Sequence, residues 1–488
     1  MTTVACSAKV LTPLSPADRA RFVATNLSPH LFRSVASPEV QDPAKTAWRI
    51  SPEPFPLKPQ TVAAFEVLGA DLLKFYRAAN KLYYQSVRGT APRFIAEYLE
   101  FGKPEHIVRL QRQNRFKNEL PGVIRPDVIL TDDGFIASEL DSVPGGLGFV
   151  GAMGESYCEL GYDQIGEFDG IQRGFARMVV SQAGGKEKPV VVIVVSRESN
   201  DYRGEMDWLA SAVTATGQAD AITVAPENIV FTEEAIVVDT PAGRRTVDVL
   251  YRFFELFDLL NIPKQELMLY AARHKRVSIT APPKSFLEEK LLFGLFHNPA
   301  LGPLWLQELG ADTLARLTKI FPQTWILDPR PLPPQAAIAG LVVDGRPLQA
   351  WNQLYGLSKS ERQFVVKPSG FSDLAWGSRG VHVANDLTRD EWMAVIDGGL
   401  SMFEKTPHIL QRFHKGRRVQ VSYLDTTSGE MRPLDGRVRL CPYYFVTGEE
   451  SVQLGGILAT IAPADKRLIH GMTDAVLTSS ILREPAAP

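Results

Sequence analysis

Two short apolar runs in residues 125–141, joined by a tight polar turn, constrain the fold of this chain more than any other stretch. The runs read DVIL and GFIASEL, and the linking residues TDDG are typical of a two-stranded antiparallel hairpin. Four charged residues, Arg125, Asp127, Glu139 and Asp141, lie on the two predicted strands. Buried carboxylates without a partner are costly, so the cluster requires water, a basic partner or a metal cation.

The composition is that of a globular protein with material for two or three domains. The chain has 488 residues, of which 45% are hydrophobic and 22% are charged. Its formal net charge is -2, and lysine and arginine are never massed in one block, so we expect no nucleic-acid partner. The longest apolar run, VVVIVV at 190–195, is far shorter than the roughly 18 residues that cross a bilayer, so we expect no membrane partner either.

Cysteine usage and the first residues favour a cytoplasmic location. Cys6, Cys158 and Cys441 are widely separated and form no CxxC motif, so their spacing predicts three unpaired thiols in a reducing compartment. The first twenty residues have neither a basic start nor a sustained apolar run, so we expect no secretory signal.

Hydrophobic periodicity divides the chain into differently built regions. Residues 1–60 predict an irregular leader with one short helix near 15–27, and residues 61–115 predict helices, because apolar residues recur every three or four positions. From residue 188 a buried strand, a helix and another strand indicate an open α/β unit. Residues 281–296 predict an amphipathic helix that begins at proline and serine.

The hairpin carboxylates suit a magnesium site. Asp127 and Glu139 lie on opposite arms, and Glu139 and Asp141 share one strand face because they are two residues apart. Three converging acids repel one another unless a divalent cation or a basic partner neutralises them, and oxygen ligands suit Mg²⁺. Arg125 lies on the face of Asp127 and could contact a phosphate held by that metal. A solvated strand face with a surface salt bridge is the alternative.

A second motif, in residues 363–385, suits phosphate binding. The apolar run FVVKP predicts a buried strand that places Lys367 near its end, and the loop that follows has glycines at 370, 377 and 380. Backbone N–H groups and a lysine ammonium together offset phosphate charge. An ordinary long hairpin is the alternative, and no GxxxxGK[ST] motif occurs in the chain.

Three further positions are weaker candidates. Lys290 lies in a predicted helix, where a lone lysine is usually a solvated surface residue. Gln411 lies in the strand-like run HILQRF, which could offer backbone groups to an adenine edge. Arg437 and Arg439 point to one face of a predicted strand and suit an anion or a pair of carboxylates.

Other familiar templates fit poorly. Gly146, Gly148 and Gly151 satisfy GxGxxG, but the residues before them, ELDSVPGG, are acidic and interrupted by proline. A hairpin also replaces the expected βαβ opening, which argues against a nicotinamide or flavin site. The chain has no HExxH and no GxSxG motif.

In their order along the chain, these motifs resemble those of the glutathionylspermidine synthetase-like ligases of the ATP-grasp superfamily. The run R-x-D, a twelve-residue step to E and then x-D is similar to the metal-binding strands of that family. SFLEEKLL resembles its first nucleotide lysine, FVVKPSG with GSRGV the second lysine and its glycine flap, and ILQRF the hinge. The metal strands come first, which is a circularly permuted order. The resemblance runs from about residue 121 to 475.

The resemblance implies a role for each matched position. It implies that Asp127, Glu139 and Asp141 hold Mg²⁺ between ATP phosphates, and that Arg125 and Arg439 are catalytic. The implied nucleotide contacts are Lys290, Lys367, Ser369, Gly370, Gly377, Arg379, Gly380 and Gln411. Two positions depart from the family pattern: Asp141 stands where asparagine is common, and Arg412 follows Gln411 where an acid is common.

The implied fold is α/β (α+β), with an ATP-grasp core, a Rossmann-like pre-ATP-grasp unit and a mainly helical N-terminal region. The expected boundaries are 1–120 for the leader and helical region, 121–185 for the metal-site strands, 186–280 for the Rossmann-like unit and 281–488 for the nucleotide-binding part. The implied activity is an ADP-forming ligase that joins a small-molecule carboxylate to an amine through an acyl-phosphate. The sequence does not indicate the two substrates or the oligomeric state.

Three alternatives stay open at this point. The same fold can serve an ATP-dependent phosphotransferase, or a binding protein with a degenerate nucleotide site. A Rossmann oxidoreductase is the third, because GxGxxG is present.

Overall fold

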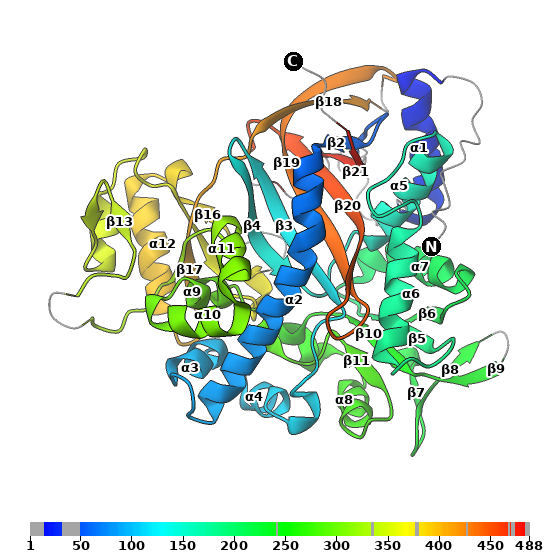
Figure 1. Ribbon diagram of the computed structural model, residues 1–488, viewed down its shortest axis with the longest axis horizontal. Helices are drawn as coiled ribbons and strands as arrows, with labels where there is room; N and C mark the ends of the chain where they lie inside the picture. Colours follow the sequence, from blue (N-terminus) through cyan, green and yellow to red (C-terminus); the bar gives the residue numbers. More distant parts are fainter. Residues whose placement is uncertain are drawn as a thin grey trace.

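A computed structural model gives the fold of the chain. It describes residues 14–31, 49–240, 243–332, 336–375, 380–425, 428–466, 469 and 474–483. Figure 1 shows a long central sheet, a parallel sheet below it and a separate small sheet at one side. The predicted mixed α/β class is confirmed.

Within the described residues, the central sheet has eight strands in the order β1-β21-β20-β19-β3-β4, with β18 beside β19 and β2 beside β21. β19 pairs antiparallel with both β20 and β3, so the C-terminal strands hold the predicted hairpin in place. The strands are β1 Arg49–Ile50, β2 Phe55–Leu57, β3 Val123–Thr131, β4 Gly134–Asp141, β18 Arg418–Leu424, β19 Met431–Val446, β20 Val452–Pro463 and β21 Val476–Leu482.

Helices α1 Pro16–Leu31, α2 Pro59–Val87, α3 Phe94–Glu100 and α4 Glu105–Gln111 form the N-terminal region. The predicted helical region and the predicted short helix before it are therefore confirmed. Helix α2 runs along the central sheet (Figure 1), and the ring of Phe65 packs on Phe135 of β4. Farther along the helix, Phe75 packs on Trp305 and Phe321 instead.

A four-stranded parallel sheet of order β11-β10-β5-β6 confirms the α/β unit predicted from residue 188. Both faces of β5 are buried: Val191 and Ile193 pack among α5 to α7, whereas Val192 and Val194 pack on the side of α8. The elements are α5 Leu147–Glu159, α6 Gly170–Gln182, β5 Val190–Val195, α7 Arg203–Ala215, β6 Asp220–Val224, β10 Val249–Phe253, α8 Gln265–Arg273 and β11 Ser278–Thr280; the strands β7 Val230–Phe231, β8 Ile236–Thr240 and β9 Gly243–Thr246 project beside them.

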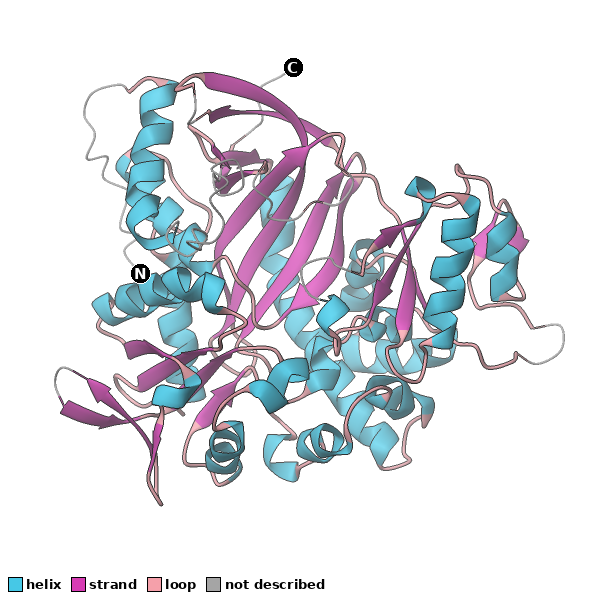
Figure 2. Ribbon diagram, turned by 180° about the vertical axis from the view of Figure 1, so that it is seen from behind, coloured by secondary structure: helices cyan, strands magenta, loops and turns pink. Residues whose placement is uncertain are grey.

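The small antiparallel sheet has the order β12-β17-β15-β16 and carries the second predicted motif. Figure 2 shows it beside the central sheet, with helix α12 packed on it. Its elements and neighbours are α9 Leu291–Phe296, α10 Gly302–Leu309, α11 Ala311–Ile320, β12 Thr324–Ile326, β13 Val342–Val343, β14 Arg346–Pro347, β15 Phe364–Pro368, β16 His382–Val383, α12 Arg389–Ser401 and β17 His408–Arg412.

The prediction of one amphipathic helix over 281–296 is wrong. A short 3₁₀ turn, Ser285–Glu288, is followed by Glu289 with extended backbone angles of φ -88° and ψ 128°, and α9 begins only after Lys290. Phe286, Leu287 and the whole of α9 are buried. Because the segment is enclosed on all sides, it has no solvent face for an amphipathic helix to present.

Cysteine pairing also differs from the prediction. Cys158 on α5 is disulfide-bonded, so the expectation of three unpaired thiols is wrong, and cysteine usage no longer supports a reducing compartment. Cys441 is free and buried.

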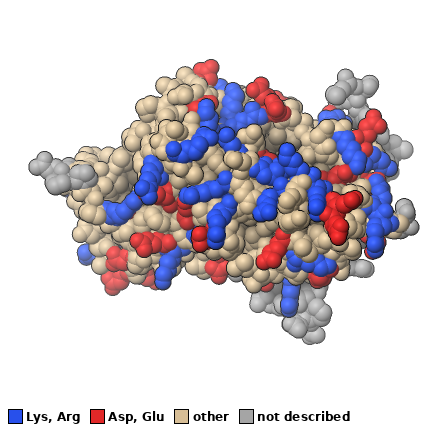
Figure 3. Space-filling view, turned by 90° about the horizontal axis from the view of Figure 1, so that it is seen from below, with Lys and Arg blue, Asp and Glu red and all other residues tan. Residues whose placement is uncertain are grey.

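Two surface features bear on possible partners. None of the helices in the described ranges combines the length and the apolar character that a membrane crossing requires. Figure 3 shows many basic side chains on the lower face of the molecule, with acidic side chains among them.

The aromatic core under α2 generates a stability prediction. Phe75 is fully buried, and its ring centroid lies 5.5 Å from that of Trp305 and 5.0 Å from that of Phe321. We expect Phe75→Ala to lower the free energy of unfolding by about 3–5 kcal/mol, because it leaves a cavity where several rings meet. Urea unfolding measures this change, and Leu260→Ala, at a residue 67% exposed, is the control. A loss below about 1 kcal/mol would contradict this packing.

Candidate active site

A cavity of about 550 Å³ separates the central sheet from the small sheet. β3, β4 and β19 supply one wall, and β15 and β17 supply the other. Its polar lining includes Asp127, Ser138, Glu139, Lys367, Asn385, Gln411, Arg412, His414, Lys415, Arg437 and Arg439. Residues from the two motifs therefore meet at one cavity, although more than 200 positions separate Lys367 from Glu139.

The hairpin pairs as predicted. Asp127 lies directly opposite Glu139, and Arg125 lies opposite Asp141. The register shifts after Asp127, so that Val128 faces Ala137 and the intervening Ser138 is an extra residue on β4. A bulge of this kind bends the strand and redirects its side chains. It lies beside Glu139, at the wall of the cavity.

Asp127 and Asp141 each have a basic partner. Arg125 Nη2 lies 2.9 Å from Asp141 Oδ2 and 3.1 Å from Asp127 Oδ1, and Arg439 Nη1 lies 2.9 Å from Asp127 Oδ2. Burial on its own would raise the pKa of Asp127, but Arg125 and Arg439 hold it below the usual value. Burial raises the pKa of Asp141, and Arg125 offsets this only in part.

The two candidate lysines reach the same carboxylate region from different elements, Lys290 from the residue before α9 and Lys367 from β15. Lys290 is buried and its Nζ lies 2.8 Å from Glu139 Oε1, which excludes the alternative of a solvated surface lysine. Lys367 Nζ donates to Gln411 Oε1 at 3.0 Å and to the carbonyl oxygen of Ser138 at 3.2 Å. Within the described residues Lys367 has no carboxylate at ion-pair distance, and its burial lowers its pKa to about 8.

The charges of the site favour an anionic ligand. The site has three carboxylates and four cationic side chains. The carboxylates are Asp127, Glu139 and Asp141, and the cations are Arg125, Arg439, Lys290 and Lys367. No group of three or more acidic, histidine or cysteine side chains in the described ranges is arranged to hold a metal ion. The carboxylates supply the oxygen ligands that Mg²⁺ prefers, but each first has to leave its basic partner.

Gln411 lies at the cavity but not at a free strand edge. It pairs with Thr324 of β12 on one side and with Val365 of β15 on the other, so its backbone is already engaged. Its side chain donates to Thr324 Oγ1 at 3.2 Å. The cavity lining continues from Gln411 over residues 412–416.

The glycine loop after Lys367 is described only in part. Ser369 is buried and its Oγ has no partner among the described residues. Gly370 donates its N–H to Glu289 Oε2 at 3.1 Å, and Gly380 donates its N–H to the Leu374 carbonyl at 3.0 Å. Gly377 and Arg379 lie outside the described residues.

Sequence reasoning missed a second charged group that borders Asp141. Arg252 is fully buried at the end of β10 and forms an ion pair with Glu288. Burial, together with Glu288 and Asp141, raises the pKa of Glu255 to about 8. Glu255 follows the carboxyl end of a parallel strand, which is where α/β sheets bind ligands. This position could have marked Glu255 as a candidate site residue from the sequence alone. Glu288 could not be recognised as a site residue, because the segment around it was predicted to be a regular amphipathic helix.

A carboxylate already occupies the glycine-rich turn GLGFVG. The backbone N–H groups of Gly146, Gly148 and Phe149 donate to the buried Glu205, whose burial raises its pKa to about 7. This is the place at the start of α5 where a pyrophosphate would have to bind. The arrangement supports the argument against a dinucleotide site.

Glu255 generates a prediction about pH. The folded protein keeps this proton up to about pH 8, whereas an unfolded chain releases it near 4.5. Stability from this group is therefore present below pH 4.5 and is lost as the pH rises to about 8. Between pH 4.5 and 8, unfolding of the wild type releases up to one proton from Glu255, whereas unfolding of Glu255→Gln does not. We therefore expect the free energy of unfolding of the variant to depend less steeply on pH.

Urea unfolding at several pH values measures this slope, and Glu266→Gln, at an exposed position of α8, is the control. An unchanged slope in Glu255→Gln would contradict the buried, protonated state.

Comparisons with known proteins give a fold relationship. No protein-family model matches the chain, and no curated protein matches it. A glutathione synthetase-like effector (GSS30) from Globodera pallida, solved in apo form, is similar with a TM-score of 0.56 at 12% identity, over 96% of this chain and 98% of that one. A protein from Methylobacillus flagellatus, provisionally named a gamma-glutamylcysteine synthetase, matches with a TM-score of 0.41 at 11% identity, over 78% of this chain and 85% of that one. At this TM-score the likeness does not establish a shared fold. The chain therefore has a glutathione synthetase-like fold.

Proposed function

We propose that this protein is an ATP-dependent carboxylate–amine ligase that forms an amide bond through an acyl-phosphate and releases ADP and phosphate. The observation that carries the proposal is the cavity between the two sheets, where Asp127, Glu139, Lys367 and Arg439 meet. The glutathione synthetase-like fold and the order of the motifs along the chain support the same assignment.

Ligand binding in this cavity is an exchange of ionic partners. Lys290 and Glu139 neutralise each other in the ligand-free protein, as do Arg439 and Asp127. Phosphate oxygens would replace the carboxylates as partners of the lysines, and the carboxylates would then be free to hold Mg²⁺. Bound there, Mg²⁺ would neutralise charge on the phosphates. Mg²⁺ alone would neutralise only the carboxylates of the site, and nucleotide alone only its cations. Mg²⁺ and nucleotide should therefore strengthen each other's binding.

The reaction needs charge stabilisation more than covalent help from the protein. A substrate carboxylate oxygen attacks the γ-phosphorus, the bond to the β-phosphate oxygen breaks, and ADP leaves. Lys290, Lys367 and an arginine, Arg125 or Arg439, offset the charge on the phosphoryl oxygens. The neutral amine then attacks the acyl carbon, phosphate leaves with the oxygen that it received, and the amine loses one proton.

The central prediction concerns ADP release over a panel of carboxylates and amines. We expect Lys367→Ala and Glu139→Gln to reduce turnover by at least about 10²-fold, because Lys367 would offset phosphate charge directly and Glu139 would hold the Mg²⁺ that does so. Both variants should keep the fold, as measured by circular dichroism. Lys359→Ala and Glu234→Gln, at exposed positions outside the cavity, are the matched controls.

Full activity in both cavity variants would overturn the site. A stable phosphorylated product without amide formation would instead indicate a phosphotransferase. Absence of any nucleotide effect would indicate a degenerate site.

A second prediction is mutual dependence of Mg²⁺ and nucleotide. With a non-hydrolysable ATP analogue at about 100 times its Kd, the free energy of unfolding should rise by about 2.7 kcal/mol when Mg²⁺ is present. Without Mg²⁺ the gain should be much smaller, because Glu139 and Asp127 keep competing for the cations. Thermal unfolding with each ligand alone and together measures the coupling. Strictly additive effects would contradict the exchange of partners.

A further inference from the structure

The N-terminal helices contact the segment that leads to Lys290 at three separate points. The segment is 284–290, which the sequence resemblance connects to nucleotide binding, whereas the N-terminal region of residues 59–119 has no counterpart in that resemblance. Each contact involves a buried polar or charged group, and none of them belongs to the cavity lining.

The first contact is a buried lysine. Lys284 Nζ donates to Asn80 Oδ1 at 2.8 Å, to the Glu119 carbonyl at 2.7 Å and to the Lys117 carbonyl at 3.0 Å. Its three N–H groups are thus all used by the N-terminal region. Burial lowers its pKa to about 7.

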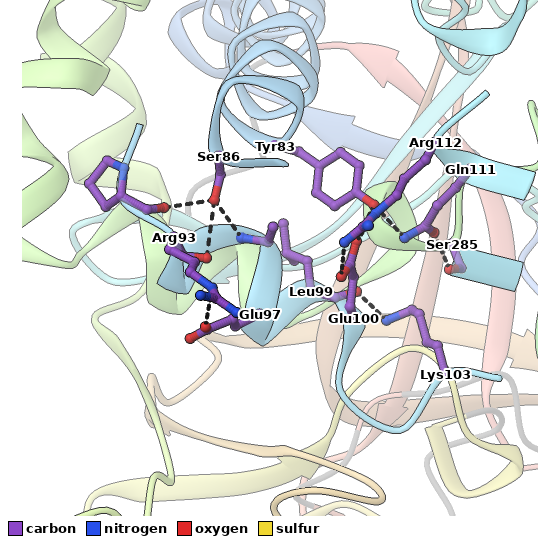
Figure 4. Close-up of polar contacts among 12 residues, drawn as sticks. Tyr83, Ser86, Arg93, Glu97, Leu99, Glu100, Lys103, Gln111, Arg112 and Ser285 are labelled. Carbon is purple, nitrogen blue, oxygen red and sulfur yellow. Dashed lines mark hydrogen bonds and ion pairs between the residues drawn. The ribbon is translucent and has the colours of Figure 1, made fainter. Parts of the chain in front are cut away.

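The second contact is a chain of hydrogen bonds from α3 to the segment (Figure 4). Tyr83 Oη donates to Glu100 Oε1 at 2.6 Å, and Gln111 Nε2 donates to Tyr83 Oη at 2.8 Å. Ser285 Oγ donates to Gln111 Oε1 at 2.8 Å, which closes the chain. The ring of Phe286 stacks on Tyr83 with 3.8 Å between centroids.

The third contact is an ion pair between Lys103 and Glu289, with the two side chains 0% and 1% exposed. Lys103 Nζ also donates to the Leu99 carbonyl at 2.7 Å, which fixes it to the end of α3 (Figure 4). The second oxygen of Glu289 accepts the N–H of Gly370. A side chain at Gly370 would have its Cβ only 2.0 Å from the Glu288 carbonyl oxygen, so the two segments pack at the closest distance that glycine allows.

We propose that residues 59–119 act as the positioning element for Lys290 and for the turn after Lys367, with the Lys103–Glu289 pair as the principal contact. Glu289 is the residue next to Lys290, and it also binds the turn that begins three residues after Lys367. One buried pair therefore sets the spacing of both lysines. The consequence for nucleotide binding rests on the function proposed above, whereas the fixing of the two segments does not.

The test is a double-mutant cycle in binding of a Mg²⁺-loaded ATP analogue. We expect Lys103→Met to weaken binding about tenfold in the wild-type background. In a Lys290→Ala background the same change should have a much smaller effect, because the residue that it positions is gone. Lys81→Met is the matched control, since Lys81 lies on α2 but pairs with Glu308 outside the segment.

Lys103→Met leaves a buried carboxylate without its cationic partner and lowers folding stability for that reason alone. The double variant Lys103→Met/Glu289→Gln removes both charges and should fold, yet it should still bind the analogue about tenfold more weakly. The same loss of affinity with and without Lys290 would overturn the positioning role and indicate a general structural effect.

Hydrogen exchange on the ligand-free protein separates this proposal from the proposed function. In the double variant the amides of Gly370 and of the first turn of α9 should exchange faster, while amides of the central sheet should not change. Unchanged exchange at both places would contradict the proposal. Faster exchange in a protein that binds no nucleotide would leave the positioning of the segments intact and reject the ligase assignment.

Discussion

Residues 284–290 form the junction at which the parts of this molecule meet. Lys284, Ser285 and Glu289 contact the N-terminal helices. Glu288 binds Arg252 at the end of the parallel sheet, and Lys290 binds Glu139 of the central hairpin. A segment whose side chains face different partners in turn cannot keep a regular amphipathic helix, which explains its 3₁₀ turn and extended break. The position of Lys290 beside Glu139, which lines the cavity, depends on all of these contacts.

The cavity is built from charges that compensate one another before any ligand arrives. Carboxylates on β3 and β4 and cations on β19 and on the 284–290 junction are close enough to form ion pairs. Lys367, on β15, bonds only to Gln411 and to a backbone oxygen among the described residues, so its charge is the least compensated. Such a site remains stable when empty because its buried charges are paired. In the function proposed above, a phosphate with its cation would replace those pairs.

Local sequence patterns correctly predicted those strands and turns whose formation depends on residues close together in the chain. Alternation and the TDDG turn located the hairpin, and the apolar run at 190–195 located a buried parallel strand. Long-range contacts had no local signal: the burial of Lys290 results from its partner 151 positions earlier in the chain, and Glu288 and Glu255 become neighbours only through the packing of β10 against the junction. The disulfide at Cys158 could not be predicted either, because wide spacing says nothing about proximity in space.

The most direct test of the central claim is an experimental structure with Mg²⁺ and a non-hydrolysable ATP analogue. The account predicts that the phosphates lie between β4 and β15, with Lys290 and Lys367 on phosphate oxygens and with Asp127 and Glu139 on the metal side. A nucleotide bound elsewhere, or one bound in the cavity while Lys290 and Glu139 remain paired, would contradict it.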